Sequence, residues 1–363
     1  MVYRSLLRPL LFRLPPETAH HLALRSLSLT RPFKSLVSFN VDESMAVSRF
    51  GLHFSHPVGL AAGFDKNGIA LRELASLGFS HIEAGTVTYH AQPGNPLPRL
   101  FRLPKDQALI NRAGFNNDGA DAFTERARGN KPRCVLGVSI GKSKVTPLES
   151  AVDDYLKSFE SVYSVADYVA INVSSPNTPQ LRQLQQVDQL SYLLKDLKNR
   201  NHVLQTLHSR SRPIPLLVKL SPDLSNEEVE GIVAVLGEQQ VDGIIATNTT
   251  ITRNNLNSSV EEVRACGDGG LSGKPLRNKS TELVRDIYKL SKGRIPIIGV
   301  GGVFTATDAW EKIAAGASLV QLYTGFIYEG PLVVRRIVTG LKQLMIREGF
   351  HRLEDAIGHG NPL

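Results

Sequence analysis

The chain repeats one pattern eight times: a short apolar run of strand length, followed by a longer stretch with helical periodicity. Most of the runs are aliphatic throughout and do not alternate with polar residues, as expected of parallel strands buried on both faces. The runs are 57–62, 80–85, 134–140, 168–173, 216–220, 243–247, 296–300 and 318–323, and the helical stretches are 69–77, 119–127, 152–165, 187–207, 226–237, 279–292, 306–315 and 331–346.

Eight such units in series predict an α/β fold, a single (β/α)8 TIM barrel. A doubly wound open sheet is the alternative, which the length of the series and the lack of a GxGxxG after the first run disfavour. The length of 363 residues and the hydrophobic content of 42% exclude disorder as the main state of the chain. Cys134 and Cys266 stand alone, which excludes a disulfide scaffold and a zinc cluster and indicates a reducing compartment.

The first 40 residues hold six basic side chains and one glutamate, so they carry five of the eight net positive charges. Leucines recur at helical spacing over 3–14, and a second helix is expected from Glu17 through Leu27 and on to Leu29, between Pro15-Pro16 and Arg31-Pro32. Basic amphipathic helices are typical of a segment that lies in a membrane interface. A helical hairpin packed on the body or on a dimer partner is the equally favoured alternative.

We therefore expect residues 1–40 to form a membrane-associating helical extension and residues 41–363 to form the barrel domain. No apolar stretch is long enough to span a membrane, and the arginines that interrupt the first leucines argue against a signal peptide. The body is nearly neutral, which argues against a nucleic-acid partner. The sequence of residues 347–363 predicts neither a structural element nor a function.

In a barrel of this kind, the residues that follow the strands carry the function. Here they are rich in amides and hydroxyls and include two lysines, which suits an anionic ligand that forms hydrogen bonds. Glycines after the seventh run (299–302), together with residues around the eighth, match the place where many barrels hold a phosphate. There is no metal-ligating set, no carboxylate pair and no Ser–His pair, so a bound cofactor is the expected source of reactivity.

Six motifs in one order resemble those of the class 2, quinone-dependent dihydroorotate dehydrogenases, and the resemblance extends to about residue 345. They are GLAAGFDKNG at 59–68, PGN at 93–95 with PRLFR at 98–102, NRAGFNN at 111–117, SSPNT at 174–178, ATNTT at 246–250 and GGLSG at 269–273. The resemblance implies an FMN enzyme of pyrimidine biosynthesis. Such an enzyme oxidises (S)-dihydroorotate to orotate and passes the electrons to ubiquinone or menaquinone.

The resemblance also implies the site residues. Lys219 would lie by the N1/O2 edge of the flavin, and Ser139 stands where the family commonly has asparagine. The expected FMN contacts are Ala62, Gly63, Phe64, Asp65, Lys66, Thr86, Ser139, Asn172, Lys219, Thr247, Gly273, Gly302, Tyr323 and Thr324. The expected substrate contacts are Lys66, Asn111, Arg112, Ala113, Gly114, Phe115, Asn172, Asn177, Asn248 and Thr249.

The catalytic base implied by the resemblance is Ser175, because class 2 members use a serine where class 1 members use a cysteine, and neither cysteine lies in this loop. An unassisted serine is a poor base, so we expect a relay through Thr178 and a water. Ser174 and Ser175 acting only as turn caps is the alternative. In the family the N-terminal helices form a quinone tunnel, to which His20 and Arg102 correspond, and no separate membrane-spanning anchor is expected.

The resemblance implies a peripheral protein on the cytoplasmic side of a bacterial inner membrane. Three other functions stay open on the residues alone. They are another flavin barrel such as a dihydrouridine synthase, a lyase or aldolase with Lys219 or Lys66 as a Schiff-base lysine, and a non-catalytic binding barrel. We expect no metal.

Overall fold

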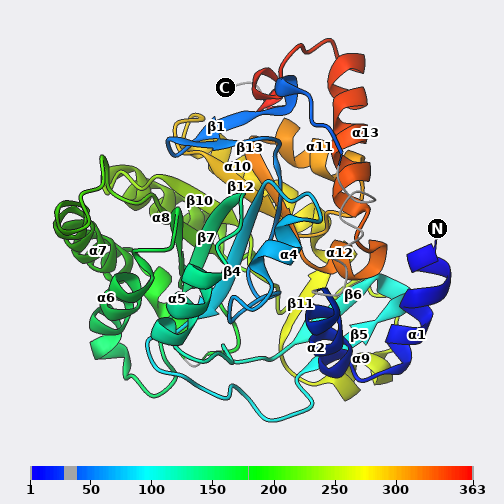
Figure 1. Cartoon of the computed structure of the whole chain (residues 1–363), viewed down its shortest axis with the longest axis horizontal. Helices are drawn as coiled ribbons and strands as arrows, with labels where there is room; N and C mark the ends of the chain where they lie inside the picture. The colour runs from blue at the N-terminus through cyan, green and yellow to red at the C-terminus, as the bar shows by residue number, and fades with distance from the viewer. Residues whose placement is uncertain (1, 28–38, 179, 362–363) are drawn as a thin grey trace.

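Eight parallel strands close into a barrel in the computed structural model, which describes residues 2–27, 39–178 and 180–361 (Figure 1). Each predicted run forms one of the strands, so the (β/α)8 prediction is confirmed. Around the barrel the order is β10-β12-β13-β3-β4-β7-β8-β9. The strands are β3 (Val58–Leu60), β4 (His81–Val87), β7 (Val135–Ile140), β8 (Tyr168–Asn172), β9 (Leu216–Leu220), β10 (Gly243–Ala246), β12 (Ile297–Val300) and β13 (Ala317–Leu322).

Helices cover the outside of the barrel at the predicted places, with ends that differ by a few residues. Because the strand residues are buried almost throughout, each strand contributes to the core on both faces. Reciprocal capping boxes at Ser225 and Thr305 start two of the helices. The helices are α4 (Leu71–Ala75), α5 (Ala120–Gly129), α6 (Ala151–Val162), α7 (Val187–Leu207), α8 (Asn226–Glu238), α10 (Arg277–Leu290), α11 (Ala306–Ala314) and α13 (Val333–Arg347).

A three-stranded antiparallel sheet lies at the carboxyl ends of the barrel strands, in the order β11-β6-β5. The sequence analysis did not predict it, because each strand has only four residues and none shows a clear period. It is built from β5 (Leu100–Leu103), β6 (Ala108–Asn111) and β11 (Gly270–Gly273), with α9 (Val260–Cys266) and α12 (Thr324–Glu329) beside it. A small apolar cluster that includes Ile110, Cys266 and Leu271 holds it together.

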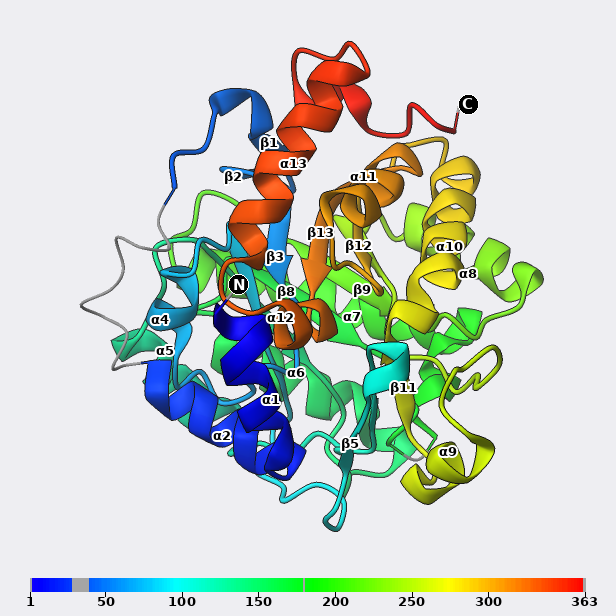
Figure 2. The ribbon, with the colours of Figure 1, turned by 90° about the vertical axis from the view of Figure 1, so that its right-hand side faces the viewer.

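The N-terminal segment forms a π-helical turn (Tyr3–Leu7), α1 (Arg8–Arg13) and α2 (Pro16–Ser26), which lie beside β5 and α12 (Figures 1 and 2). The predicted break at Pro15 is confirmed, whereas Leu29 and Arg31-Pro32 lie outside the described residues. Tyr3 Oη donates to the Ile327 carbonyl at 2.6 Å, and the Glu17 carboxylate pairs with Arg99 at 2.7 Å.

None of the helices in the described part of the chain is long and apolar enough to cross a membrane. The outward side of the N-terminal helices is nevertheless apolar. Its exposed residues are Val2, Leu6, Leu7, Leu10, Leu14 and Leu22.

The opposite end of the barrel is closed by the hairpin β1 (Val47–Arg49) and β2 (Leu52–Phe54) and by a turn near the C-terminus (Leu353–Ala356). Arg49 pairs with Glu354 at 2.7 Å, and the Gly358 amide donates to the Ile313 carbonyl at 2.9 Å. The C-terminal residues, for which the sequence predicted no structure, therefore pack against the barrel. The remaining short turns are Glu43–Met45, Pro104–Asp106, Leu148–Ser150, Leu181–Gln185 and Lys274–Leu276.

Candidate active site

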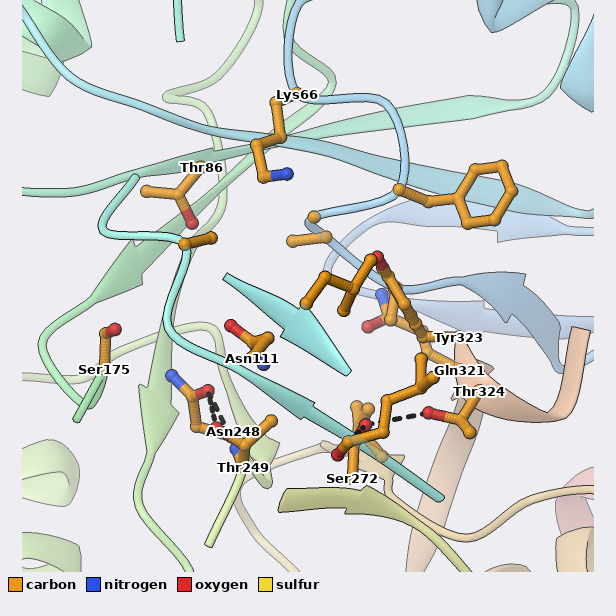
Figure 3. A pocket seen from close by; sticks show the side chains of 18 of the residues that line it. Lys66, Thr86, Asn111, Ser175, Asn248, Thr249, Ser272, Gln321, Tyr323 and Thr324 are labelled. Carbon is orange, nitrogen blue, oxygen red and sulfur yellow. Dashed lines mark hydrogen bonds between the residues drawn. The ribbon is translucent and has the colours of Figure 1, made fainter. Parts of the chain in front are cut away.

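One cavity is lined by residues at the carboxyl ends of the barrel strands, on the three-stranded sheet and on helix α2. Figure 3 shows it from close by, with ten of its lining residues labelled. All but three of the residues predicted for the site line it. They are His20, Ala62, Gly63, Phe64, Asp65, Lys66, Thr86, Asn111, Ala113, Gly114, Phe115, Asn172, Ser175, Asn177, Lys219, Thr247, Asn248, Thr249, Gly273, Gly302, Tyr323 and Thr324.

One end of the cavity is a cradle of backbone and hydroxyl groups near the end of β12 and the start of α12. Gly302 has φ 72° and Gly273 has φ 103°, and a Cβ on either would collide with neighbouring backbone, so only glycine fits. Ser272 Oγ and Thr324 Oγ1 are hydrogen-bonded at 2.8 Å (Figure 3). Uncharged donors of this kind suit the oxygens of a phosphate.

Two pairs of asparagine side chains line the opposite part of the cavity. Asn177 Nδ2 donates to Asn111 Oδ1 at 3.1 Å, and Asn248 Nδ2 donates to Asn172 Oδ1 at 3.2 Å. Asn172 Nδ2 in turn donates to Thr86 Oγ1 at 2.9 Å. The four amides come from β6, from the ends of β8 and β10 and from the loop after β8, so folding alone brings them together. They offer donors and acceptors without net charge, as recognition of a planar ring with carbonyl and N–H groups requires.

Ser175 lies on the loop after β8, is 5% exposed, and accepts a hydrogen bond from the Asn177 amide at 3.3 Å. Arg182 holds this loop through the Ser174 carbonyl at 3.2 Å and pairs with Asp223. Within the described residues, no histidine or carboxylate is hydrogen-bonded to Ser175, and the buried Thr178 Oγ1 has no hydrogen-bond partner. The serine therefore lacks a strong neighbouring base.

Lys66 follows β3 and points its ammonium group into the cavity (Figure 3). The preceding Asp65 carboxylate accepts from the amides of Ile69 and Ala70 at 3.0 and 2.8 Å, so it fixes the loop while its burial raises its own pKa. Burial lowers the pKa of Lys66 to about 8. No carboxylate of residues 2–27, 39–178 and 180–361 lies within ion-pair distance of this ammonium group, which makes it available to an anionic ligand.

The floor of the cavity is a buried polar network, of which the sequence analysis predicted only Lys219. Lys219 Nζ pairs with Glu83 Oε1 at 3.1 Å, and Tyr168 Oη and Gln321 Nε2 donate to Glu83 Oε2 at 3.2 and 3.1 Å. All four side chains belong to barrel strands. The available signal was a polar residue in the middle of a buried apolar run, as with Glu83 in His81–Val87 and Gln321 in Ala317–Leu322.

The end of the cavity near α2 is aromatic. The His20 ring meets Phe64 edge-on at 4.9 Å, and Phe64 contacts Tyr323 at 5.6 Å. Burial, together with the nearby Lys66 charge, lowers the pKa of His20 to about 3, so this imidazole is neutral near pH 7. Burial raises the pKa of Tyr323 to about 12. The rings at this end suit a flat partner, and they lie beside the Glu17–Arg99 ion pair, which also lines the cavity.

Comparison with known proteins places these features in a family. The family model for dihydroorotate dehydrogenase matches residues 44–345. The chain belongs to the dihydroorotate dehydrogenase family. It is 52% identical over 362 residues to the dihydroorotate dehydrogenase (quinone) of Gloeobacter violaceus, covering 98% of both chains. It is 46% identical to that of Roseiflexus sp., covering 98% of this chain and 97% of the relative.

The fold agrees with a solved member of the family. The crystal structure of DHODH from Eimeria tenella in complex with ferulenol superposes with a TM-score of 0.86 at 40% identity, covering 95% of each chain. Dihydroorotate dehydrogenases of this quinone-dependent kind are flavoenzymes that oxidise dihydroorotate with a quinone as acceptor in pyrimidine biosynthesis, and the chain is an oxidoreductase of that kind. The predicted class of enzyme is confirmed.

Three residues that the resemblance assigned to the dehydrogenase site do not line the cavity. Ser139 is fully buried and hydrogen-bonded to Thr86 Oγ1 at 2.9 Å. The Arg112 guanidinium donates to the carbonyls of Cys266, Asp268 and Pro98 and stacks on Phe101, so it braces the sheet. Arg102 donates to the Leu14 carbonyl at 2.8 Å and lies 4.4 Å over the Phe12 ring, at the turn between α1 and α2.

Proposed function

We propose that the chain oxidises (S)-dihydroorotate to orotate on a bound FMN, with Ser175 as the base and a membrane quinone as the final acceptor. The observation that carries this proposal is the convergence of Ser175, Lys66 and the four asparagine amides on one cavity that also holds the glycine cradle. In the overall reaction dihydroorotate loses two electrons and two protons, as a hydride from C6 and a proton from C5, and the quinone gains two electrons and two protons to become a quinol.

The residues present fit FMN. The cradle around Gly273, Gly302 and Thr324 suits the phosphate, and the buried Gln321 Oε1 at the floor has no partner among the described residues. An unpartnered buried acceptor suits a ligand with ring N–H groups. When bound, FMN supplies the two-electron acceptor for the C6–H bond of dihydroorotate and passes the electrons to the quinone. Lys219 would lie at its N1/O2 edge.

This chain's residues supply the binding and the proton transfer. Lys66 pairs with the substrate carboxylate, and Asn111, Asn172, Asn177 and Asn248 read the ring carbonyl and N–H groups. Ser175 removes the C5 proton. Because its hydroxyl has no basic partner in the part of the chain that the structure describes, the proton passes on through Thr178 and a water, a route that Thr178 Oγ1, itself without a partner there, supports.

The variant Ser175→Ala tests the base. We expect this variant to bind FMN and orotate as the wild type does. The rate at which dihydroorotate reduces its flavin should fall at least a hundredfold, the usual contribution of general base catalysis. The matched control is Ser174→Ala in the same loop. Its hydroxyl contacts the side chains of Asn172 and Asn248, so we expect weaker orotate binding but, with saturating dihydroorotate, flavin reduction at nearly the wild-type rate. An unchanged rate of flavin reduction in Ser175→Ala would show that this serine is not the base. A wild-type protein without flavin absorbance would show that the chain does not bind FMN.

We further propose that residues 1–40 bind the membrane surface and admit the quinone, which makes the chain a peripheral protein on the cytoplasmic side of a bacterial inner membrane. Support comes from the exposed leucines of the N-terminal helices beside basic residues such as Arg4. The cavity reaches α2 at His20 and Leu24, so a quinone held there would approach Phe64 and Tyr323. Arg102 holds the turn between α1 and α2 through the Leu14 carbonyl.

Vesicle binding tests the membrane surface. The double variant Leu6→Gln/Leu10→Gln removes apolar side chains that are 62% and 57% exposed. We expect it to lose co-sedimentation with anionic phospholipid vesicles while its flavin is still reduced by dihydroorotate. The control Leu207→Gln changes a leucine that is 69% exposed on α7 and should bind as the wild type does. Equal binding by all three proteins would refute the assignment.

A further inference from the structure

The buried network under the cavity carries an inference about Glu83. This residue lies on β4, is 0% exposed and does not line the cavity, yet it pairs with Lys219, which does. Each oxygen of its carboxylate has a partner: Lys219 on Oε1, and Tyr168 with Gln321 on Oε2. Such full satisfaction is required of a carboxylate buried this deeply.

The barrel also makes room for this arrangement. A Cβ on Gly137 would collide with the Tyr168 ring, so the glycine on β7 lets the tyrosine cross the barrel interior toward Glu83. Gln321 Nε2 contacts both the carboxylate and Tyr168 Oη, the latter at 3.2 Å. Strands β4, β7, β8, β9 and β13 thus all contribute to holding one negative charge against one positive charge.

We propose that Glu83 is a positioning residue that sets, through Lys219, how strongly the cavity floor favours the reduced over the oxidised flavin. This inference rests on the proposed FMN site. A lysine at the N1/O2 edge stabilises the negative charge that develops there on reduction, and in a buried site its effect is large. Glu83 opposes part of that positive charge and holds the ammonium group in place. The pair therefore limits the stabilisation that Lys219 alone would give.

The variant Glu83→Gln tests the idea because it keeps the shape and removes the charge. Lys219 is then unopposed, so we expect FMN binding to tighten at least tenfold more for the reduced than for the oxidised form. For a two-electron couple that ratio equals a positive shift of about 30 mV in the midpoint potential. The potential is measured by reductive titration of the holoenzyme against a reference dye, and FMN affinity by fluorescence of the released cofactor.

Three further comparisons separate this role from a structural one. In a Lys219→Met background, Glu83→Gln should no longer shift the potential, since the residue acts through the lysine. Tyr168→Phe removes one donor to Glu83 Oε2, so the unchanged negative charge is less offset and opposes Lys219 more strongly, and its potential should shift the other way. The control Asp242→Asn, a carboxylate whose Oδ2 accepts from the Leu216 amide at the opposite end of the barrel, should not shift.

A purely structural role predicts weaker FMN binding in both redox states and no change in potential, and that outcome overturns the inference. Persistence of the shift in the Lys219→Met background overturns it as well. If Glu83→Gln does not fold, an unchanged potential in Tyr168→Phe has the same consequence. Failure of the proposed function is distinguishable, because the wild type would then hold no flavin to titrate.

Discussion

The protonation of Lys66 should make the binding of orotate depend on pH. Its burial lowers the pKa of the ammonium group to about 8, and the orotate carboxylate needs the protonated form. The protonated fraction then falls from about nine-tenths at pH 7 to about one-tenth at pH 9. Orotate affinity should therefore fall about tenfold, or about 1.4 kcal/mol, over this range. The pKa of Lys66 in the enzyme without orotate governs this loss of affinity, because bound orotate keeps the lysine protonated.

Binding of orotate, measured by the perturbation of the flavin spectrum, isolates this effect from proton removal by Ser175. The neighbouring groups do not interfere: His20 has a pKa of about 3 and Tyr323 a pKa of about 12, so neither titrates between pH 7 and 9. The matched variant is Lys66→Arg, whose guanidinium stays charged throughout. Its affinity for orotate should be independent of pH. A tenfold fall in Lys66→Arg as well, or a flat profile in the wild type, would refute the reasoning.

Three other results are expected. Between pH 7 and pH 5, the free energy of unfolding of the wild type should fall by about 2 kcal/mol more than that of His81→Leu, as measured by urea denaturation with saturating FMN. Burial lowers the pKa of His81 to about 3, so the stability from its neutral form is lost as pH falls below about 6.5; parallel pH profiles would contradict this. Ser139→Ala should retain its full FMN content by absorbance, because the hydroxyl contacts Thr86 and not the cavity; loss of most of the flavin would argue for a direct contact. Glu17→Gln should lower hydrogen-exchange protection of the α2 amides about fivefold, since it removes a half-buried pair with Arg99 worth about 1 kcal/mol; unchanged protection would show that the pair does not anchor α2.

The sequence predicted the barrel because most of its eight strands are aliphatic throughout, a pattern that follows directly from burial on both faces. It also predicted the residues after those strands, since parallel strands bring their carboxyl ends to one rim. It missed the sheet of β5, β6 and β11, whose short strands are stabilised by pairing with segments far away along the chain, as between Leu271 and Ile110. Register across such distances leaves no local period.

Side-chain direction was the other limit. Arg112 and Ser139 stand within or beside motifs of the site, but a motif does not show on which side of its strand or loop a residue points. Arg112 turns toward the carbonyls of α9 and its following turn, and Ser139 toward Thr86. Glu83 was missed for the opposite reason: it lies inside an apolar run, where an isolated charge looked like part of the core and its partner Lys219 was 136 positions away.

The distribution of charge along the cavity connects these observations to electron flow. The ammonium group of Lys66, which has no ion-pair partner among the described residues, is near enough to His20 to lower the pKa of that imidazole, so its positive charge acts on the proposed substrate position and on the end near α2 alike. The floor holds a neutralised pair, and the end near α2 meets its partner with the uncharged rings of His20, Phe64 and Tyr323. The asparagine amides and the rings near α2 differ in chemistry, and we propose that the anionic substrate lies against the amides and the neutral quinone against the rings. Because both ends border the proposed flavin position, electrons can pass between the two partners without either entering the other's site.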